Sequence, residues 1–290
     1  MFAPTDFAYY DLQRRRRSGD INTLFPGWQP GDERIAVLCP HDDDGILGAG
    51  YAILAAQAHG APVYPCIFCD GRAGYSRPEQ RTTIVETRRG ETAAAYGALG
   101  IPPERVRHFD YPDFSLNGWV GWLLPGGQQG TMSQLLLTLR QLGITRLMIP
   151  NGYREHIDHE AAFRAGAYDA PQVGDPVLAD WGLAAPVRSV TVYAVWGDFT
   201  PEDALVAGRS AKVRGDRAIA APLAAEELIA AALAKWASQG QIIQGLLAAR
   251  RARRLGDRVI EAYLGYDPRP SLDYAPYRRM IEGIDGLKKT

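Results

Sequence analysis

The sequence predicts an α/β protein with a Rossmann-like, mostly parallel sheet, helices on both faces and a helical C-terminal portion. Short apolar runs of the buried-strand type recur at Arg34–Pro40 and Arg146–Pro150. Segments with helical spacing of apolar residues separate such runs, and this alternation is typical of βαβ units. The 290 residues show no internal repeat and no clear linker, so we expect one domain over 1–290.

The predicted elements follow in order along the chain. Residues 1–33 are punctuated by Pro and Gly and predict an irregular N-terminal arm, and residues 34–200 predict the catalytic α/β core. The core strands are expected at Arg34–Pro40, Pro62–Asp70, Arg105–Pro112, Arg146–Pro150 and Ser189–Trp196, and the helices at Gly45–Gly60, Thr83–Leu99, Met132–Gly143 and His159–Ala170. Residues 201–290 predict a mainly helical portion, with helix over 224–263 broken near Gly240–Gly245.

Composition excludes several classes of function. With 32 basic and 33 acidic residues the net charge is −1, so there is no general electrostatic reason to bind nucleic acid or an anionic membrane. No apolar run is long enough to span a bilayer, and the N-terminus lacks the apolar segment of a secretory signal. Three Cys favour a reducing compartment, which predicts a cytoplasmic protein. The Arg14–Arg17 run fits a solvated face or the subunit contact of a homo-oligomer.

Two polar clusters follow predicted parallel strands. His41–Asp44 comes directly after the first core strand, and His156–His159 lies a few residues after Arg146–Pro150. In open α/β sheets, ligands bind beyond the carboxyl ends of the strands, so we expect the two clusters to meet there. Three of the five histidines lie in these clusters.

The residue types in the clusters suit a metal site. Adjacent carboxylates repel one another unless a cation is present, and imidazole with carboxylate oxygens suits Zn²⁺ or another divalent transition metal. Two His and one Asp leave a coordination position open, as in catalytic sites, and a spare carboxylate and a spare His could transfer protons. Alternatively, the acidic run could simply favour a helix N-terminus, and the histidines could lie on a polar surface.

Taken together, the two motifs resemble those of the PIG-L/LmbE-like zinc-dependent deacetylases, which include N-acetylglucosaminyl deacetylases. The family motifs are H-P-D-D-E and H-P-D-H, and this chain has HDDDG from His41 and HIDH from His156. Three other segments resemble weaker family segments: RRGETAAAYGALG from Arg88, HFDYPDFSL from His108 and KWASQ from Lys235. The resemblance covers about residues 34–240.

The resemblance implies a metal centre and a base. It implies His41, Asp44 and His159 as the ligands of Zn²⁺. It also implies Asp43 as the general base that accepts a proton from the attacking water. The carboxylate and imidazole ligands are all present in this sequence.

The resemblance also assigns the neighbouring residues. His156 would face the developing oxyanion or the leaving amine, and Asp158 would be its partner and hold the imidazole ring in orientation. Arg88 and Asp113 would contact sugar hydroxyls or nearby groups of the substrate. These roles are implied by matching positions and not by spacing.

The chain departs from the family motifs at three positions. Asp42 replaces the usual Pro, which removes a fixed φ and adds a charge. Gly45 replaces the usual Glu, and Ile157 replaces the Pro of the second motif. The expected ligands and base persist, but these departures weaken any transfer of substrate identity from well-known members of the family.

The implied activity is hydrolysis of an N-acetyl group on a small amino sugar or sugar conjugate, which releases acetate and a free amine. The same residues fit a zinc-dependent amidase that acts on a non-acetyl amide or a thiol conjugate. A magnesium-dependent phosphohydrolase with an Asp nucleophile would explain Asp42-x-Asp44 but leave His156 and His159 without a role. An inactive relative that binds carbohydrate is the last alternative.

Other signals have plainer interpretations. Trp119 and Trp122, in the Gly-rich loop after Asp113, form either a pocket wall or the buried anchors of that loop. The glycines from Gly45 to Gly50 are in the wrong order for a dinucleotide-binding loop, so close packing of helix on sheet explains them better. His59 and His108 are interpreted as ordinary surface or core histidines.

Overall fold

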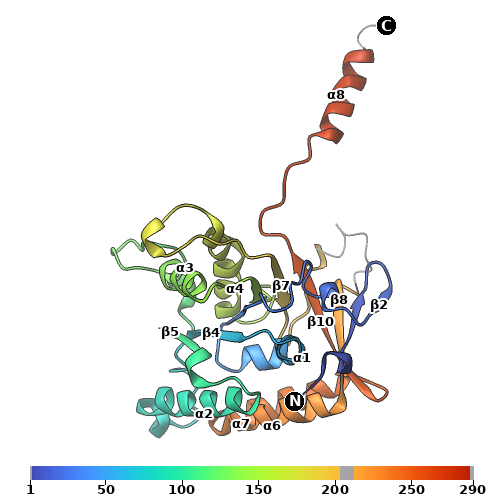
Figure 1. Ribbon diagram of the computed structural model, residues 1–290. Coiled ribbons are helices and arrows are strands. Elements are labelled where there is room, and N and C mark those ends of the chain that lie inside the picture. Colours follow the sequence, from blue (N-terminus) through green and yellow to red (C-terminus); the bar gives the residue numbers. More distant parts are fainter. Residues whose placement is uncertain (1, 203–211, 288–290) are drawn as a thin grey trace.

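A long mixed sheet crosses the middle of the molecule (Figure 1). The computed structural model describes residues 2–202 and 212–287, and ten strands of this part form the sheet. In sheet order they are β2 (Arg16–Ser18), β1 (Ala8–Asp11), β8 (Arg217–Pro222), β10 (Arg258–Tyr266), β7 (Ser189–Tyr193), β6 (Arg146–Pro150), β3 (Ile35–Cys39), β4 (Val63–Cys69) and β5 (Arg107–Tyr111), and β9 (Arg254–Leu255) pairs with β10.

The five strands from β7 to β5 are parallel and confirm the predicted Rossmann-like core. All five residues of β3 are buried, as are all five of β6, which is why both strands read as continuous apolar runs. The chain passes from β3 to β4 and β5 on one side, then crosses back to β6 on the other. The strand order therefore reverses between β3 and β6, where open sheets of this kind bind ligands.

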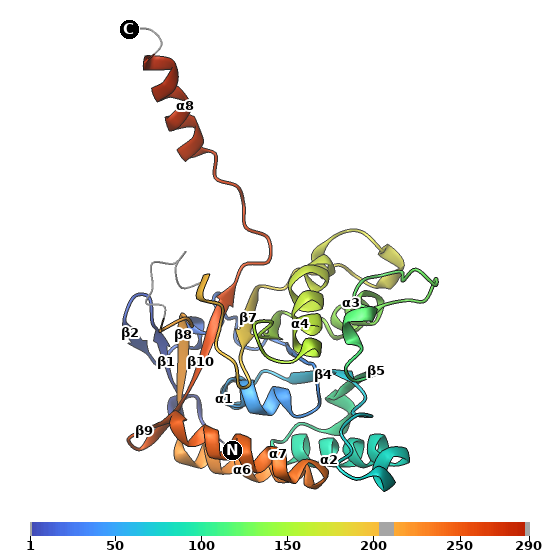
Figure 2. The ribbon, with the colours of Figure 1, turned by 180° about the vertical axis from the view of Figure 1, so that it is seen from behind.

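Helices cover both faces of the sheet (Figures 1 and 2). One face carries α1 (Asp44–Ala58), α2 (Ile84–Ala98), α6 (Leu223–Leu233) and α7 (Gly240–Arg250), and the other carries α3 (Thr131–Leu142) and α4 (Ile157–Arg164). Each face has its own cluster of buried apolar side chains. No helix in the described residues is long and apolar enough to cross a membrane.

The structure corrects two predictions of local structure. Part of the N-terminal arm, expected to be irregular, forms the hairpin β1–β2, and β1 pairs with β8 about 200 residues later. The helix predicted over 224–263 is right up to Arg250 but wrong from Arg258, where β10 lies between β7 and β8. Pairing with distant strands overrides local propensity here, and a local pattern does not reveal such partners.

A buried ion pair connects the N-terminal segment to β6. Arg146 donates hydrogen bonds from Nε and Nη2 to Glu33, at 2.9 and 2.8 Å, and both side chains are buried. Burial alone would raise the pKa of Glu33, but the hydrogen bonds from Arg146 and Thr145 outweigh burial and lower it to about 2. The ionised Glu33 therefore stabilises the folded state over most of the pH range.

Replacing Glu33 with Gln is expected to lower the free energy of unfolding at neutral pH by about 3 kcal/mol, because Arg146 loses its charged partner. The contribution of the carboxylate is fully present above its ordinary pKa of 4.5 and disappears as pH falls towards about 2. Urea unfolding of both proteins across this pH range measures the effect. The exposed substitution Glu104→Gln is the control, and a wild-type advantage that persists at the acid end contradicts the prediction.

Candidate active site

The two predicted motifs meet at the carboxyl ends of β3 and β6. His41 lies between β3 and α1, Asp44 is the first residue of α1, and His159 lies in the first turn of α4. His41 Nδ1 is 3.2 Å and His159 Nε2 is 3.1 Å from the same atom, Asp44 Oδ2. One ligand atom from each of the three residues lies within 4.8 Å of the others. The structure thus brings together the three residues expected to bind zinc.

His159 offers a buried nitrogen, Nε2, that lies 3.1 Å from Asp44 Oδ2 but not in hydrogen-bond geometry. Its Nδ1 lies 2.6 Å from the Glu155 carboxylate and donates to it, so the neutral ring has a lone pair on Nε2. Within the described part of the chain this Nε2 makes no hydrogen bond, although the side chain is fully buried. Burial would lower the pKa of His159, but the charge of Asp44 and the hydrogen bond to Glu155 raise it to about 9. The set therefore attracts positive charge, and its donor atoms fit Zn²⁺.

Two other sets in the described residues are close enough to share a metal ion, and both include His41. They are His41, His156 and Asp158, and His41, Cys69 and Asp113. His41 faces the first of these through Nε2, which lies 3.2 Å from Asp158 Oδ2, while its Nδ1 faces Asp44. The set with Asp44 and His159 is favoured because it contains the unsatisfied nitrogen.

Asp43 lies beside the candidate ligands. Burial and the neighbouring carboxylate of Asp44 raise the pKa of Asp43 to about 7. Arg88 Nη2 is 3.9 Å from Asp43 Oδ1 and opposes this shift. A cation bound by Asp44 would, like Arg88, lower the pKa of Asp43. It would thereby keep Asp43 ionised, as a proton acceptor must be.

His156 and Asp158 begin α4 and face His41. His156 is the N-cap, and its Nδ1 accepts the backbone N–H of Asp158 at 3.2 Å, so the neutral ring carries its proton on Nε2. The Asp158 carboxylate accepts the backbone N–H groups of Phe114 and Leu116, at 2.7 and 3.1 Å. It lies nearer to His41 Nε2, at 3.2 Å, than to His156 Nδ1, at 3.5 Å. Asp158 thus orients His156 through its backbone and His41 through its carboxylate.

Known proteins share the fold of this chain. Residues 36–168 match the family model of the GlcNAc-PI de-N-acetylases, PIG-L. The N,N'-diacetylchitobiose deacetylase of Pyrococcus horikoshii superposes with a TM-score of 0.62 at 14% identity, over 86% of this chain and 90% of that one. The chain has the PIG-L/LmbE deacetylase fold. No curated protein matches the sequence.

Other solved structures share the PIG-L/LmbE fold with this chain. A conserved protein of Thermus thermophilus has a TM-score of 0.58 at 23% identity and covers 82% of this chain and 96% of its own. The 4-carboxy-2-hydroxymuconate hydratase of Pseudomonas putida has a TM-score of 0.59 at 17% identity, over 84% and 100%. The fold therefore hosts more than one reaction, and the site must decide the activity.

The departures from the PIG-L/LmbE motifs have local explanations. A Cβ on Gly45 would lie 2.6 Å from Cys39 Sγ and 2.7 Å from the Tyr96 hydroxyl, so the start of α1 leaves no room for a side chain. A Cβ on Gly48 would meet Tyr193 at 2.4 Å, which supports the packing explanation of these glycines. Ile157, in place of the second Pro, is the first residue of α4, a position that Pro favours but does not require.

Asp42, in place of the first family Pro, is the centre of a buried polar network. It accepts hydrogen bonds from Arg88 Nε at 3.0 Å, from the Thr92 hydroxyl at 2.8 Å and from Trp236 Nε1 at 3.2 Å. Asp113 accepts two backbone N–H bonds from the loop after β4. Arg88 and Asp113 thus lie near the site but bind within the protein, and their contacts with substrate remain a prediction.

Glu155 is a residue of the candidate site that sequence reasoning missed. Besides holding His159, its carboxylate accepts the backbone N–H groups of Val195, Trp196 and Gly197, at 2.8 to 3.2 Å. It therefore connects the candidate ligand to the loop after β7. The available signal was an acidic residue next to the second motif, four residues before His159.

Replacing Glu155 with Gln is expected to weaken zinc binding about 10- to 100-fold, because the amide oxygen accepts the hydrogen bond from His159 Nδ1 less strongly than the carboxylate does. Competition with a chromophoric chelator measures the affinity. Glu160→Gln, on the exposed side of α4, is the matched control. Equal zinc affinities for the two variants would show that Glu155 does not support the metal site.

Two exposed aromatic side chains flank the site. Phe114 is 65% exposed with its ring 4.5 Å from that of His156, and Trp196 is 51% exposed with its ring 4.9 Å from that of His159. Trp119 packs on Tyr111 against the core, and Trp122 packs on Trp181. The aromatic residues next to the site are therefore not the two tryptophans considered from the sequence.

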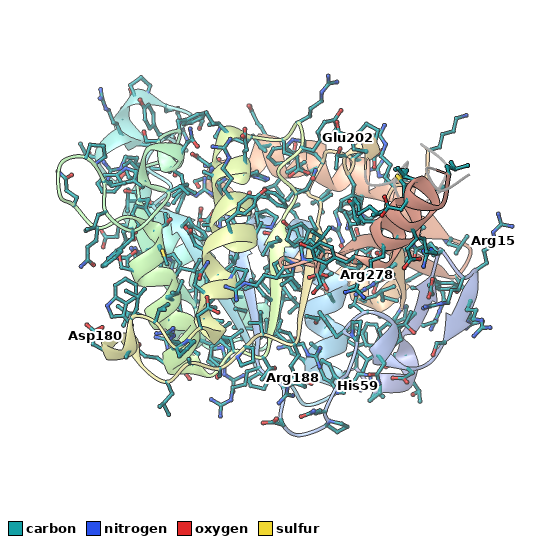
Figure 3. All side chains as sticks on the ribbon, turned by 90° about the horizontal axis from the view of Figure 1, so that it is seen from above. Arg15, His59, Asp180, Arg188, Glu202 and Arg278 are labelled. Carbon is teal, nitrogen blue, oxygen red and sulfur yellow. The ribbon has the colours of Figure 1, made fainter. Side chains whose placement is uncertain are left out.

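His59, labelled at the edge of the molecule in Figure 3, lies beside Tyr9.

Proposed function

We propose that this chain hydrolyses the N-acetyl group of a small amino sugar or sugar conjugate with the help of a zinc ion, releasing acetate and a free amine. The supporting observation is the convergence of His41, Asp44 and the unsatisfied Nε2 of His159 beside Asp43. The family match and the deacetylase fold support the same reaction class. Another divalent transition metal with the same ligand preference would serve the same site.

Different residues of the chain have different roles in amide hydrolysis. Zinc held by His41, Asp44 and His159 would supply a Lewis acid for the carbonyl and lower the pKa of water. Asp43, adjacent in sequence to a ligand, accepts the proton of the attacking water. His156 donates a hydrogen bond from Nε2 to the carbonyl oxygen as negative charge develops there. The proton held by Asp43 then passes to the leaving nitrogen, directly or through His156, as the C–N bond breaks.

Acetate release from N-acetylated amino sugars tests the proposal. Zinc-loaded protein is expected to release one acetate for each free amine formed, from N-acetylglucosamine, its oligosaccharides or its conjugates. Non-acetyl amides and thiol conjugates form the second panel, because the same catalytic residues would hydrolyse them. If only the second panel is hydrolysed, the substrate is a non-acetyl amide or a thiol conjugate and not an N-acetylated sugar. If zinc-loaded protein hydrolyses neither panel, the proposal is contradicted.

The flanking aromatic rings support a substrate with an apolar face. The face of a sugar ring or of an aromatic aglycone packs on exposed aromatic side chains such as Trp196 and Phe114. Both lie against an imidazole of the site, so a substrate bound there would sit above the reacting groups.

Replacing Trp196 with Ala is expected to raise KM about three- to tenfold and to change kcat less, because the ring binds the substrate and takes no part in proton transfer. Steady-state kinetics measures both constants, with zinc content checked because Trp196 packs on His159. Trp122→Ala removes an exposed tryptophan away from the site and is the control. A lower kcat with unchanged KM would contradict this role.

We also propose a reducing compartment, the cytoplasm, as the place where the protein acts. Its three cysteines, Cys39, Cys66 and Cys69, are buried and free. Burial raises the pKa of each thiol, so they are poor nucleophiles and inert packing groups.

A further inference from the structure

The chain ends in a helix that leaves the body of the molecule. Figures 1 and 2 show α8 (Ala275–Leu287) at the end of an extended segment, at the opposite end of the molecule from α6 and α7. We call residues 267–287 the C-terminal extension. All residues of α8 are exposed, and Figure 3, which looks down on it, labels Arg278 on this helix.

The exposed helix α8 is amphipathic. Met280 and Ile281 come three and four residues after Tyr277, and Ile284 comes four residues after Met280. The four side chains are between 48% and 69% exposed. Side chains at this spacing form one apolar stripe, and charged residues such as Arg278 and Asp285 flank it. An apolar stripe left in water on a projecting helix indicates an interaction surface.

A groove on the body of the molecule matches this stripe. It lies between α6, α7 and the start of β10 and has a volume of about 680 Å³. Its apolar lining is Leu223, Ala230, Leu247, Ala248 and Val259. Exposed Glu227, Arg251 and Arg254 also line it and can pair with the charges beside the stripe of α8. The groove therefore has the character that an amphipathic helix requires.

As the structure places it, the C-terminal extension carries α8 away from the groove of its own chain. The groove lies beside Val259, near the start of β10, and the chain leaves this strand at Tyr266. At about 3.3 Å per residue, Tyr266 lies about 23 Å along the strand from Val259. Arg269 then pairs with Asp175 through two contacts of 2.6 Å, on the other side of the sheet. Only residues 270–274 remain before α8, and they span at most about 17 Å. Pro268 and Pro270 stiffen the segment as well.

We propose that α8 of one copy binds in the α6–α7 groove of a second copy of this chain and so forms a homo-oligomer. The stripe of Tyr277, Met280 and Ile284 covers the apolar lining of the groove. This assembly buries surfaces that a single copy leaves exposed. It is independent of the proposed activity.

Two complementary variants test this assembly. Met280→Glu with Ile284→Glu charges the stripe of α8, and Ala248→Lys introduces an exposed charge into the groove. Sedimentation equilibrium of the full chain is expected to show a concentration-dependent oligomer for the wild type. Each variant should weaken association more than about tenfold. Glu282→Lys, on the far side of α8, is the control and should associate like the wild type.

Mixing the two variants distinguishes this interface from others. The helix variant has an intact groove and the groove variant has an intact helix, so an equimolar mixture should form a heterodimer while neither variant self-associates. Circular dichroism confirms that both are folded. A monomeric wild type overturns the proposal, and so does a groove variant that still associates, which would indicate helix–helix pairing.

Discussion

Replacing Asp43 with Asn is expected to lower kcat by about 10²- to 10⁴-fold while zinc and substrate still bind. The amide has the size of the carboxylate but cannot accept a proton from the attacking water. The three candidate ligands are unchanged, so zinc content should remain that of the wild type. Steady-state kinetics, with binding of the reaction product measured by calorimetry, separates the loss of chemistry from a loss of binding.

Asp110→Asn is the matched control for this experiment. Asp110 lies at the end of β5 on the same edge of the sheet, but its side chain is exposed and pairs with Arg89. It has a positive φ of 64°, which Asn tolerates, so the substitution should leave folding and kcat unchanged. If Asp43→Asn and Asp110→Asn have the same kcat, Asp43 is not the base.

The substitution His159→Ala is expected to remove both zinc and activity. The wild type should bind about one zinc per chain, as a catalytic site with three protein ligands does. Without the imidazole only His41 and Asp44 remain as ligands, and Oε2 of Glu155 loses its hydrogen bond to His159. Metal analysis after dialysis and acetate release measure the two losses, and circular dichroism confirms that the variant is folded.

Two histidine controls sharpen this result. His59→Ala, at the edge of the molecule beside Tyr9, should keep both zinc and activity. His156→Ala should keep zinc but lose much of the activity, because His156 is expected to contact the substrate and not the metal. A folded wild type that binds no zinc, or a His159→Ala variant that retains it, would refute the assignment of the metal site.

Some residues of the candidate site could be predicted from the sequence, and others could not. His41, Asp43 and Asp44 are adjacent in the chain, and His156 to His159 form one short motif, so both clusters were recognised directly. Glu155 was missed because its role depends on backbone N–H groups of residues 195–197, some 40 positions away. Phe114 was missed because its place beside His156 depends on the hydrogen bond from its backbone to Asp158.

The partners of Asp42 could not be predicted from the sequence either. The sequence shows that it replaces a Pro and adds a charge, but not what satisfies that charge. In the structure Arg88, Thr92 and Trp236 hold it, and Trp236 comes from a segment nearly 200 residues away. The substitution therefore adds a buried connection between the site loop and the C-terminal portion. Arg88, expected to face the substrate, is the main partner in this connection.

The sequence by itself determined the parallel core, the edge of the sheet where the two motifs meet and the residues that form the candidate metal site. These follow from local patterns, because buried strands, helical stripes and short motifs are encoded by neighbouring residues. Only the tertiary structure decided the pairing of β1, β8 and β10, the carboxylates that orient His41 and His159, and the position of α8. Each of these depends on contacts between segments far apart in the chain, whose free energy appears only once the fold brings them together.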